Sequence, residues 1–196
     1  LLPYKFPKLK RMRHSLKVID FVINKFLNLR IKIWKYNNNL YKDIKMEYIC
    51  EIEEETKKFI AKYRKNELTR RDAIELNWIV KYPWQLISPL NDKTQSKYYF
   101  FKKTMRYTFL NVKVFDSKDE MIGFLILKAR DNYLEIPYAY FDDMQVKKII
   151  KAVAYHMVEM NIDVFITSNE TLIKNFDSIR LPYLYKKTSP EFCFIT

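Results

Sequence analysis

Residues 133–167 have the sequence YLEIPYAYFDDMQVKKIIKAVAYHMVEMNIDVFIT, which predicts a strand, a long helix and a second strand in succession. Apolar residues alternate along the first strand, at 133–141, and we expect four of them to share one face: Leu134, Ile136, Tyr138 and Tyr140. Pro137 lies in the middle of this strand and cannot donate a hydrogen bond to a neighbouring strand. It therefore indicates a bulge, an edge or a parting of two strands at this point.

The long helix is expected to begin at Asp142 or Asp143, since either carboxylate can cap its first turn, and to end near Met160. Its apolar residues recur at intervals of three and four and predict one buried stripe: Val146, Ile149, Ile150, Val153 and Met157. Residues 162–167 are then expected to form a buried strand, and residues 169–179 a shorter helix. This succession of strands and helices predicts a mixed α/β domain.

Further elements are expected on both sides of this segment. Those on the N-terminal side are a strand at 44–50, helices at 51–65 and 69–82, and a hairpin of strands at 107–114 and 121–128. Thr69 and Asp72 form the expected capping box of the second helix, and Pro83 ends it. The expected buried residues of the first helix are Phe59, Ile60 and Tyr63, and the second helix carries Ile74, Trp78 and Ile79. On the C-terminal side, strands at 183–186 and 192–195 close the chain.

The composition disfavours phosphate-binding folds that depend on glycine. The chain has 196 residues and a single glycine, Gly123. Dinucleotide-binding fingerprints, P-loops and kinase-type phosphate loops place glycine where the backbone must approach a phosphate closely. Hydrophobic residues make up 48% and charged residues 30%, which suffices for a packed core and a solvated surface. We therefore expect a folded domain outside these three classes.

The two cysteines and two histidines are too scattered in sequence for a zinc-ligand pattern, so no metal site is expected. Cys50 and Cys193 are expected to be buried free thiols in a reducing compartment, which indicates a cytoplasmic protein. His156 in the long helix is expected to be structural, and His14 near the N-terminus to be solvated. The chain begins with LLP at residues 1–3, and we interpret it as a fragment whose upstream part is missing.

Most of the positive charge lies in an N-terminal arm. Residues 1–45 contain twelve Lys or Arg and two acidic residues, a net charge of +10 out of +13 for the whole chain. A helix is expected at 15–34 and a linker at 37–39. The apolar stripe of this helix consists of Leu16, Ile19, Ile23, Phe26 and Leu27. We therefore divide the chain into a basic amphipathic arm at 1–43 and a domain at 44–196.

Three partners remain open for this arm. It can dock on a missing N-terminal half of the same protein, lie on an anionic membrane surface, or bind nucleic acid through residues 5–35. A basic amphipathic helix with Trp34 suits a membrane surface, and clustered basic residues release counterions from phosphates. The apolar stripe requires an apolar partner, however, which bare nucleic acid does not offer.

The order of elements in residues 107–196 resembles the core of the GNAT family of acyl-CoA N-acyltransferases. Four segments also resemble bacterial GNAT-like proteins built from two tandem halves: residues 66–68 (NEL), 75–79 (ELNWI), 81–84 (KYPW) and 181–183 (LPY). The resemblance implies an α+β fold, with a central, mostly antiparallel sheet flanked by helices and preceded by a basic helical arm. It also implies that this chain is a second half, with acyl-CoA as co-substrate and a small amine or a peptide as acceptor.

The resemblance assigns the cofactor site to the place where strand 133–141 parts from the next strand. Pantetheine lies there in GNAT proteins, bonded to backbone groups, and the implied cofactor-binding residues are Tyr138, Ala139, Tyr140 and Asn169. A loop of the form Arg/Gln-x-x-Gly-x-Gly/Ala then holds the pyrophosphate at the start of the long helix, where free N–H groups meet the anion. Residues 141–146 of this chain are FDDMQV, with two carboxylates and no glycine. We therefore expect the pyrophosphate loop to be degenerate.

The resemblance also implies two catalytic residues. Glu135 lies on the strand where GNAT enzymes often place the general base that takes a proton from the attacking amine. Tyr183, with Tyr185 as its neighbour, lies near the tyrosine that protonates the leaving thiolate. Plainer interpretations stay open: Glu135 as a surface glutamate, and Tyr183 as a packing residue. Asn169 in the same way can cap the helix that follows it.

Three functions from different classes are therefore compatible with the sequence. The first is an acyltransferase module that uses acyl-CoA, or an aminoacyl donor as in the peptidoglycan Fem-type transferases. The second is a non-catalytic GNAT-like half that completes a substrate cleft or regulates the other half. The third is a basic module that binds nucleic acid or an anionic membrane.

Overall fold

A five-stranded sheet forms the centre of residues 40–180, which are one of two compact units in this chain. The computed structural model describes residues 13–38, 43–64, 71–82, 104–179, 181, 183 and 185–187. The second unit comprises residues 1–39 and 181–196, and it contains helix α2, Arg13–Asn38. This helix is longer than predicted. A linker was expected at 37–39, but residues 37 and 38 belong to the last turn of α2, so the prediction is wrong for them. Residue 39 lies outside the described residues.

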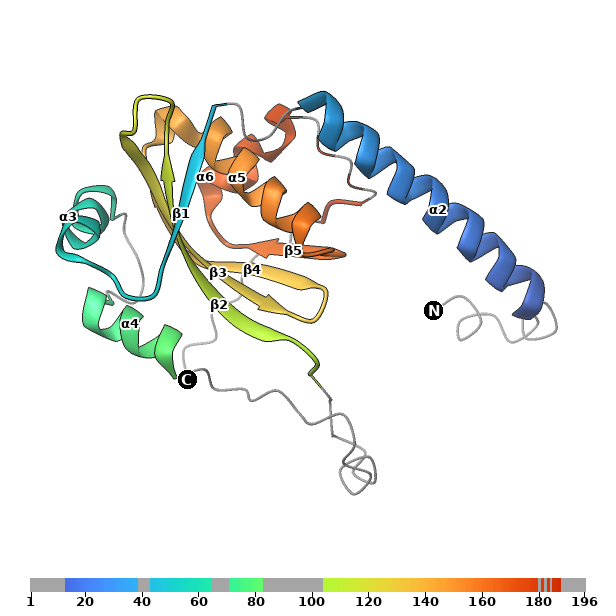
Figure 1. The fold of residues 1–196 in the computed structure, drawn as a ribbon, viewed down its shortest axis with the longest axis horizontal. Helices are drawn as coiled ribbons and strands as arrows, with labels where there is room; N and C mark the ends of the chain where they lie inside the picture. The colour runs from blue at the N-terminus through green and yellow to red at the C-terminus, as the bar shows by residue number, and fades with distance from the viewer. Residues whose placement is uncertain are drawn as a thin grey trace, which may run out of the picture. The chain divides into compact units, whose positions relative to one another are not determined.

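The strands follow chain order across the sheet (Figure 1): β1 (Lys45–Ile49), β2 (Tyr107–Phe115), β3 (Met121–Arg130), β4 (Tyr133–Phe141) and β5 (Val164–Thr167). Neighbours from β1 to β4 pair antiparallel, whereas β5 pairs parallel with β4. A parallel pair needs a crossover connection, and the long helix after β4 provides it. The mixed, mostly antiparallel sheet with flanking helices confirms the predicted α+β fold.

Helices lie on both faces of the sheet (Figure 1). One face, which we call the α3–α4 face, is covered by α3 (Glu54–Tyr63) and α4 (Ala73–Lys81). The other, the α5 face, carries a 3₁₀ turn η3 (Asp143–Gln145), α5 (Val146–Glu159), α6 (Glu170–Asn175) and a 3₁₀ turn η4 (Phe176–Ile179). The stripe predicted for the long helix is confirmed at four of its five positions, which are buried: Val146, Ile149, Ile150 and Val153.

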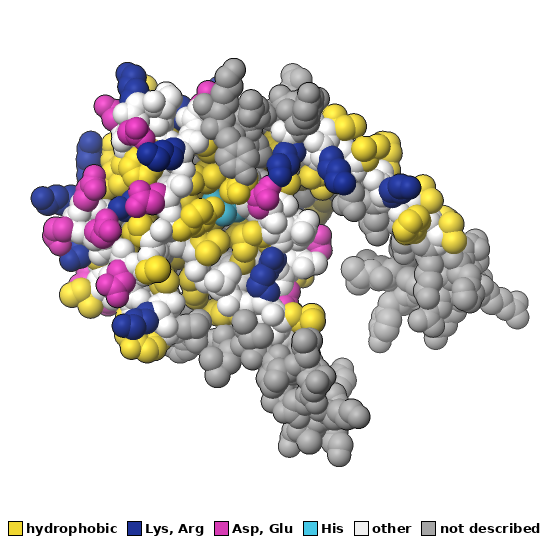
Figure 2. Space-filling model, viewed as in Figure 1, with side chains coloured by type: hydrophobic (Ala, Val, Ile, Leu, Met, Phe, Trp, Pro, Cys, Tyr) yellow, Lys and Arg dark blue, Asp and Glu magenta, His cyan; other side chains and the backbone are white. Residues whose placement is uncertain are grey.

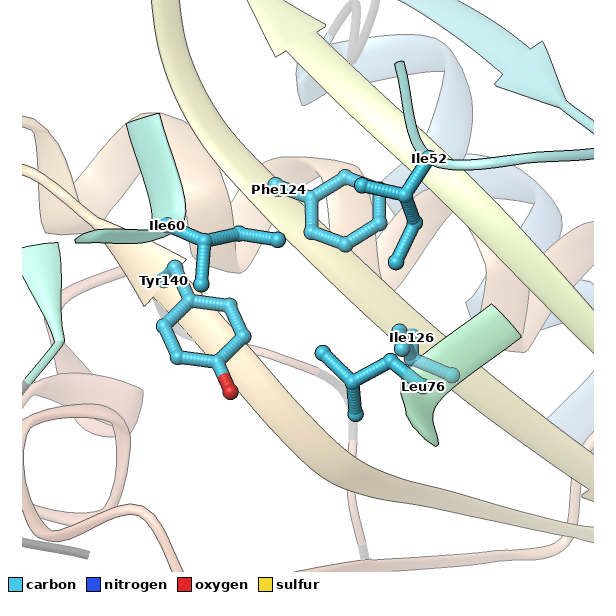
Figure 3. Packing of buried hydrophobic residues seen from close by; sticks show 6 residues of the cluster. All are labelled: Ile52, Ile60, Leu76, Phe124, Ile126 and Tyr140. Carbon is cyan, nitrogen blue, oxygen red and sulfur yellow. The ribbon is translucent and has the colours of Figure 1, made fainter. Parts of the chain in front are cut away.

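The core of the α3–α4 face is a cluster in which helix residues meet two strands (Figure 3). Ile60 and Leu76 come from α3 and α4, Ile52 comes from the loop before α3, and all three are at most 4% exposed. They pack on Phe124, Ile126 and Tyr140 from β3 and β4. Burying one large apolar side chain contributes about 1.5–3 kcal/mol, so this cluster is a main reason why α3 and α4 stay on the sheet.

The single glycine allows α5 to approach the other face of the sheet. A Cβ atom built on Gly123 would lie 2.4 Å from the Cδ1 atom of Ile149 and 3.3 Å from the Cβ atom of Phe141. Ile149 is completely buried, so its methyl group has little room to move away. Gly123 is therefore required by close packing between β3 and α5, since its φ angle is not positive.

The bulge predicted at Pro137 is confirmed, and it changes the side-chain alternation of β4. The register between β3 and β4 shifts between Ile126 and Lys128, which pair with Tyr138 and Glu135. Two residues of β4 thus occupy the space of one on β3. As a result Glu135 and Tyr138 share the α3–α4 face.

The prediction that four apolar residues of β4 share one face is therefore wrong. Leu134 pairs with Ala129, whereas Tyr138 and Tyr140 pair with Ile126 and Phe124 on the opposite face of β3. Strict alternation along a strand holds only where each residue has one partner, and the bulge breaks that condition.

The start of α4 also differs from its prediction. Asp72 is the N-cap, and Glu75 closes a capping box with it, so the predicted box of Thr69 and Asp72 is wrong. The buried residue is Leu76, whereas Ile74 and Trp78 are 74% and 53% exposed. The apolar residues of so short a helix do not by themselves select which side faces the sheet.

Three further predictions fail or lie outside the described residues. The predicted buried strand is instead the edge strand β5, in which Val164 and Ile166 are 38% and 52% exposed. Cys50 is exposed rather than buried because it lies in the turn after β1, and Cys193 lies outside the described residues. At 183–186, none of the described residues is in a strand, and the strand predicted at 192–195 cannot be compared because it is not described.

Candidate functional site

The candidate site is the place where β4 and β5 stop pairing, which we call the β4–β5 parting. It comprises Pro137–Phe141 of β4, the helix start at residues 142–145 and, two residues before Pro137 on the same strand, Glu135. The two strands pair from Tyr133 with Val164 to Ile136 with Thr167. Proline has no N–H to continue such a ladder, and β4 extends beyond this point with β3 as its described partner strand.

Backbone groups are what β4 offers to a ligand at the parting. Tyr140 is 1% exposed and belongs to the apolar cluster of the α3–α4 face. Ala139 pairs with Leu125, on the α5 face. An extended ligand can bind along a strand through main-chain hydrogen bonds. The three residues 138–140 that the resemblance implies for cofactor binding thus lie on one strand segment, with side chains on both faces.

Tyr138 is held by an arginine that sequence reasoning missed. The Nη1 atom of Arg71 donates a hydrogen bond to the Tyr138 hydroxyl at 2.5 Å. The guanidinium carbon lies 5.7 Å from the centre of the tyrosine ring, within the range of a cation–π contact. Arg64 in turn donates to the backbone oxygen of Arg71. These contacts fix the segment before α4 against β4.

Glu135 lies on the same face as Tyr138 and forms an ion pair. The Nζ atom of Lys128 donates to Oε2 of Glu135 at 2.8 Å, and 42% of the glutamate side chain remains exposed. The two residues are cross-strand partners. Lys128 thus orients the carboxylate at the half-exposed end of the face. The site therefore brings together Glu135 and Tyr138, with Arg71 and Lys128 as residues that the sequence did not indicate.

The start of the long helix is occupied by its own carboxylate. Asp142 accepts a hydrogen bond from the backbone N–H of Met144 at 2.9 Å and precedes the 3₁₀ turn η3. Gln145 is the N-cap of α5 and makes no side-chain hydrogen bond there, so the prediction that an aspartate caps the long helix holds only for the 3₁₀ turn that leads into it. Asp143 follows and is exposed. At about 4 Å and an effective dielectric near 20, two like charges repel by roughly 4 kcal/mol, so this helix start is unsuited to an anion.

Asn169 has the plainer of its two predicted roles. Its Oδ1 atom accepts from the backbone N–H of Leu172 at 3.0 Å and so caps α6. Its own backbone N–H donates to Oγ1 of Thr167 at 3.2 Å. The cap is confirmed, and a contact of Asn169 with a cofactor stays a prediction.

Tyr183 belongs to the unit made of residues 1–39 and 181–196. It is 39% exposed, and Tyr185 is 77% exposed. The structure thus places the proposed tyrosine acid and Glu135 in different units, and a role for Tyr183 in proton transfer stays a prediction.

Asn111 is a buried polar residue near the site. It is 2% exposed, and neither of its amide atoms has a hydrogen-bond partner among the described residues. It lies in one cross-strand row with Ile126 and Tyr138, on the α3–α4 face. Leaving a buried polar group without a partner costs about 1–3 kcal/mol, so this residue weakens the fold.

His156 lies on the opposite face and does not take part in the candidate site. Its Nδ1 atom lies 2.7 Å from the Ala152 carbonyl oxygen, which can only accept, so Nδ1 carries the proton. Nε2 then accepts from the Tyr48 hydroxyl at 3.1 Å. Burial lowers the pKa of His156, and burial together with the charge of Glu159 raises the pKa of Tyr48. This neutral, hydrogen-bonded histidine has a structural role, joining α5 to β1.

Among the described residues, no group of three or more His, Cys, Asp or Glu could hold a metal ion. No protein-family model matches this chain, and no curated protein and no solved structure is significantly similar to it. The candidate site is therefore interpreted from its own geometry.

Proposed function

We propose that residues 44–196 form a GNAT-like module that transfers an acyl group to an amine, as the second half of a tandem protein. The observation that supports this most is the parting of β4 and β5 at Pro137, directly before a long crossover helix. The order of strands and helices through β5 agrees with the one that the family resemblance implies. A cytoplasmic location, where acyl-CoA is present, belongs to the same proposal.

The proposed chemistry uses the two sides of the parting. The pantetheine arm of the donor lies at the β4–β5 parting, beyond the last pair of β4 with β5. Lys128 holds Oε2 of Glu135, so Oε1 is the oxygen that takes the proton from the amine. The amine attacks the thioester carbonyl, a C–N bond forms and the C–S bond breaks. The thiolate leaves and takes up a proton from a general acid.

The proposed site holds the donor by its pantetheine arm rather than by its pyrophosphate. The capping carboxylate of Asp142 takes the N–H of Met144, and Asp143 adds a second negative charge. Acyl-CoA therefore binds weakly as a co-substrate. An aminoacyl donor without a pyrophosphate avoids this repulsion altogether.

Calorimetry with two donors tests this proposal. Acetyl-pantetheine has the arm without the pyrophosphate, and we expect it to bind at least as tightly as acetyl-CoA. The double variant Asp142→Asn, Asp143→Asn removes both charges and keeps a good capping residue at 142. It should strengthen acetyl-CoA binding about tenfold, or ~1.4 kcal/mol, because partial exposure screens the repulsion. Acetyl-pantetheine binding should not change.

The matched control is Asp163→Asn, which removes one negative charge just before β5, at its N-terminal end. It should leave both affinities unchanged. Micromolar binding of acetyl-CoA to the unmodified chain would contradict the degenerate pyrophosphate loop. Failure of both donors to bind would favour the second candidate, a non-catalytic half. The two aspartates at the helix start are the observation that favours that candidate.

A further inference from the structure

Apolar side chains are exposed along one side of α2. Five residues spaced by three or four positions form a stripe, and two more lie beside it: Val18, Val22, Phe26, Leu29 and Ile33, with Ile19 and Ile23. We call these seven residues the α2 stripe. Their exposed fractions range from 48% at Ile19 to 67% at Phe26. Figure 2 shows apolar and basic side chains along this helix. A continuous exposed apolar stripe indicates a surface that has a partner.

The charge around the α2 stripe is almost entirely positive. Residues 13–38 contain six Lys or Arg and a single acidic residue, Asp20. At about 100° per residue, Lys25 and Lys32 border one edge of the stripe, and Arg30 lies between Ile19 and Ile23. All three are exposed. The apolar surface thus has cations at one edge and within its other side, which favours an anionic partner.

We propose that α2 binds in the plane of a lipid bilayer that carries anionic headgroups. The α2 stripe would insert among the upper acyl carbons. Lys25 and Lys32 would reach the headgroups from its edge, and Arg30 would extend its long side chain to them from between Ile19 and Ile23. The described part of the chain contains no helix long and apolar enough to cross a membrane. A basic amphipathic helix binds at the surface instead, through apolar insertion and attraction to anionic lipids.

Two other occupants fit the same surface less well. A second copy of α2 would bring Lys25 and Arg30 of both helices together, with almost no acidic residue to compensate. Nucleic acid would satisfy the cations and leave the apolar stripe in water. An acidic protein groove is the remaining alternative, and its binding is one outcome of the test.

Co-sedimentation of the full chain with vesicles tests the proposal. Vesicles of phosphatidylcholine alone are compared with vesicles that also contain phosphatidylglycerol. Phe26→Ser should weaken binding about tenfold, because inserting one large apolar side chain corresponds to at least that factor. The matched control is Phe21→Ser. Phe21 has the same 67% exposure as Phe26 and lies about 140° away around the helix, on the basic side, so its loss should have little effect.

A charge variant tests the electrostatic part. Lys25→Gln with Lys32→Gln should reduce binding to the anionic vesicles about fivefold for each lysine and should leave binding to neutral vesicles unchanged. Circular dichroism of each variant confirms that α2 is retained. Equal effects of Phe26→Ser and Phe21→Ser would overturn the proposal, as would equal binding to the two kinds of vesicle. A chain that ignores vesicles but binds an acidic protein or nucleic acid would also overturn it.

Discussion

Replacing Gly123 with alanine adds one methyl group at the closest contact between the sheet and α5. The new Cβ would lie 2.4 Å from Ile149 Cδ1 and 3.3 Å from Phe141 Cβ, and real Cβ contacts are longer than the first of these. Overpacking a core in this way costs about 1–3 kcal/mol. The alanine backbone is unstrained here because φ is not positive, and alanine restricts the unfolded chain, which offsets about 0.4–1 kcal/mol. We expect a net destabilisation of about 1–2 kcal/mol.

Urea denaturation of a double-mutant cycle measures this effect. Ile149→Val deletes the Cδ1 atom and alone should cost about 0.5–1.5 kcal/mol. In the double variant, the new Cβ of residue 123 occupies the vacated space. The double variant should therefore lose less free energy of unfolding than the sum of the two single losses, by about 1 kcal/mol or more. The matched control combines Gly123→Ala with Ile150→Val, a neighbour that is equally buried and should show little coupling.

Two results would refute this reasoning. The first is a Gly123→Ala variant as stable as the original chain, which would mean that Ile149 can turn away at no cost. The second is full additivity of Gly123→Ala and Ile149→Val, which would mean that these residues are not in contact.

Three further predictions concern polar residues of the same unit. Burial lowers the pKa of His156, so below about pH 6.5 the unfolded chain binds a proton before the folded one does. The free energy of unfolding should therefore be highest above this pH and fall as the pH drops toward the folded pKa, and His156→Gln should flatten this part of a urea-midpoint titration. Asn111→Leu should raise the free energy of unfolding by about 1 kcal/mol, because it removes two buried unpartnered atoms; a loss of stability would show that this amide has a partner. Asp72→Ala should lower the free energy of unfolding, measured by thermal denaturation, by about 1 kcal/mol. Asp72→Asn should not, because asparagine also caps a helix; equal losses in the two variants would contradict the capping role.

Long periodic elements could be predicted from the sequence. The α5 stripe repeats over several turns, so its buried side follows from spacing alone, and the proline of β4 indicated the bulge because it lacks an N–H. The consequence of the bulge could not be predicted, since the extra residue lies opposite Leu127 and only the pairing of β3 with β4 reveals where the alternation changes.

Contacts between distant segments were beyond sequence reasoning. Arg71 and Tyr138 are 67 residues apart, and nothing in either neighbourhood indicates the other. The capping box of α4 was predicted one turn too early, because Thr69 and Asp72 each have a side chain that can cap and only the structure shows which one does. The exposure of β5 follows from its place at the sheet edge, which is a property of the topology rather than of its apolar sequence.

The β4–β5 parting can be examined residue by residue in solution. Backbone amide shifts of the isotopically labelled chain are recorded by NMR during a titration with acetyl-pantetheine. If the pantetheine arm lies at the β4–β5 parting, the largest shift changes will lie at Tyr138–Tyr140, and those of β2 will remain small. Saturable changes located elsewhere, with Tyr138–Tyr140 unaffected, would contradict the proposed site.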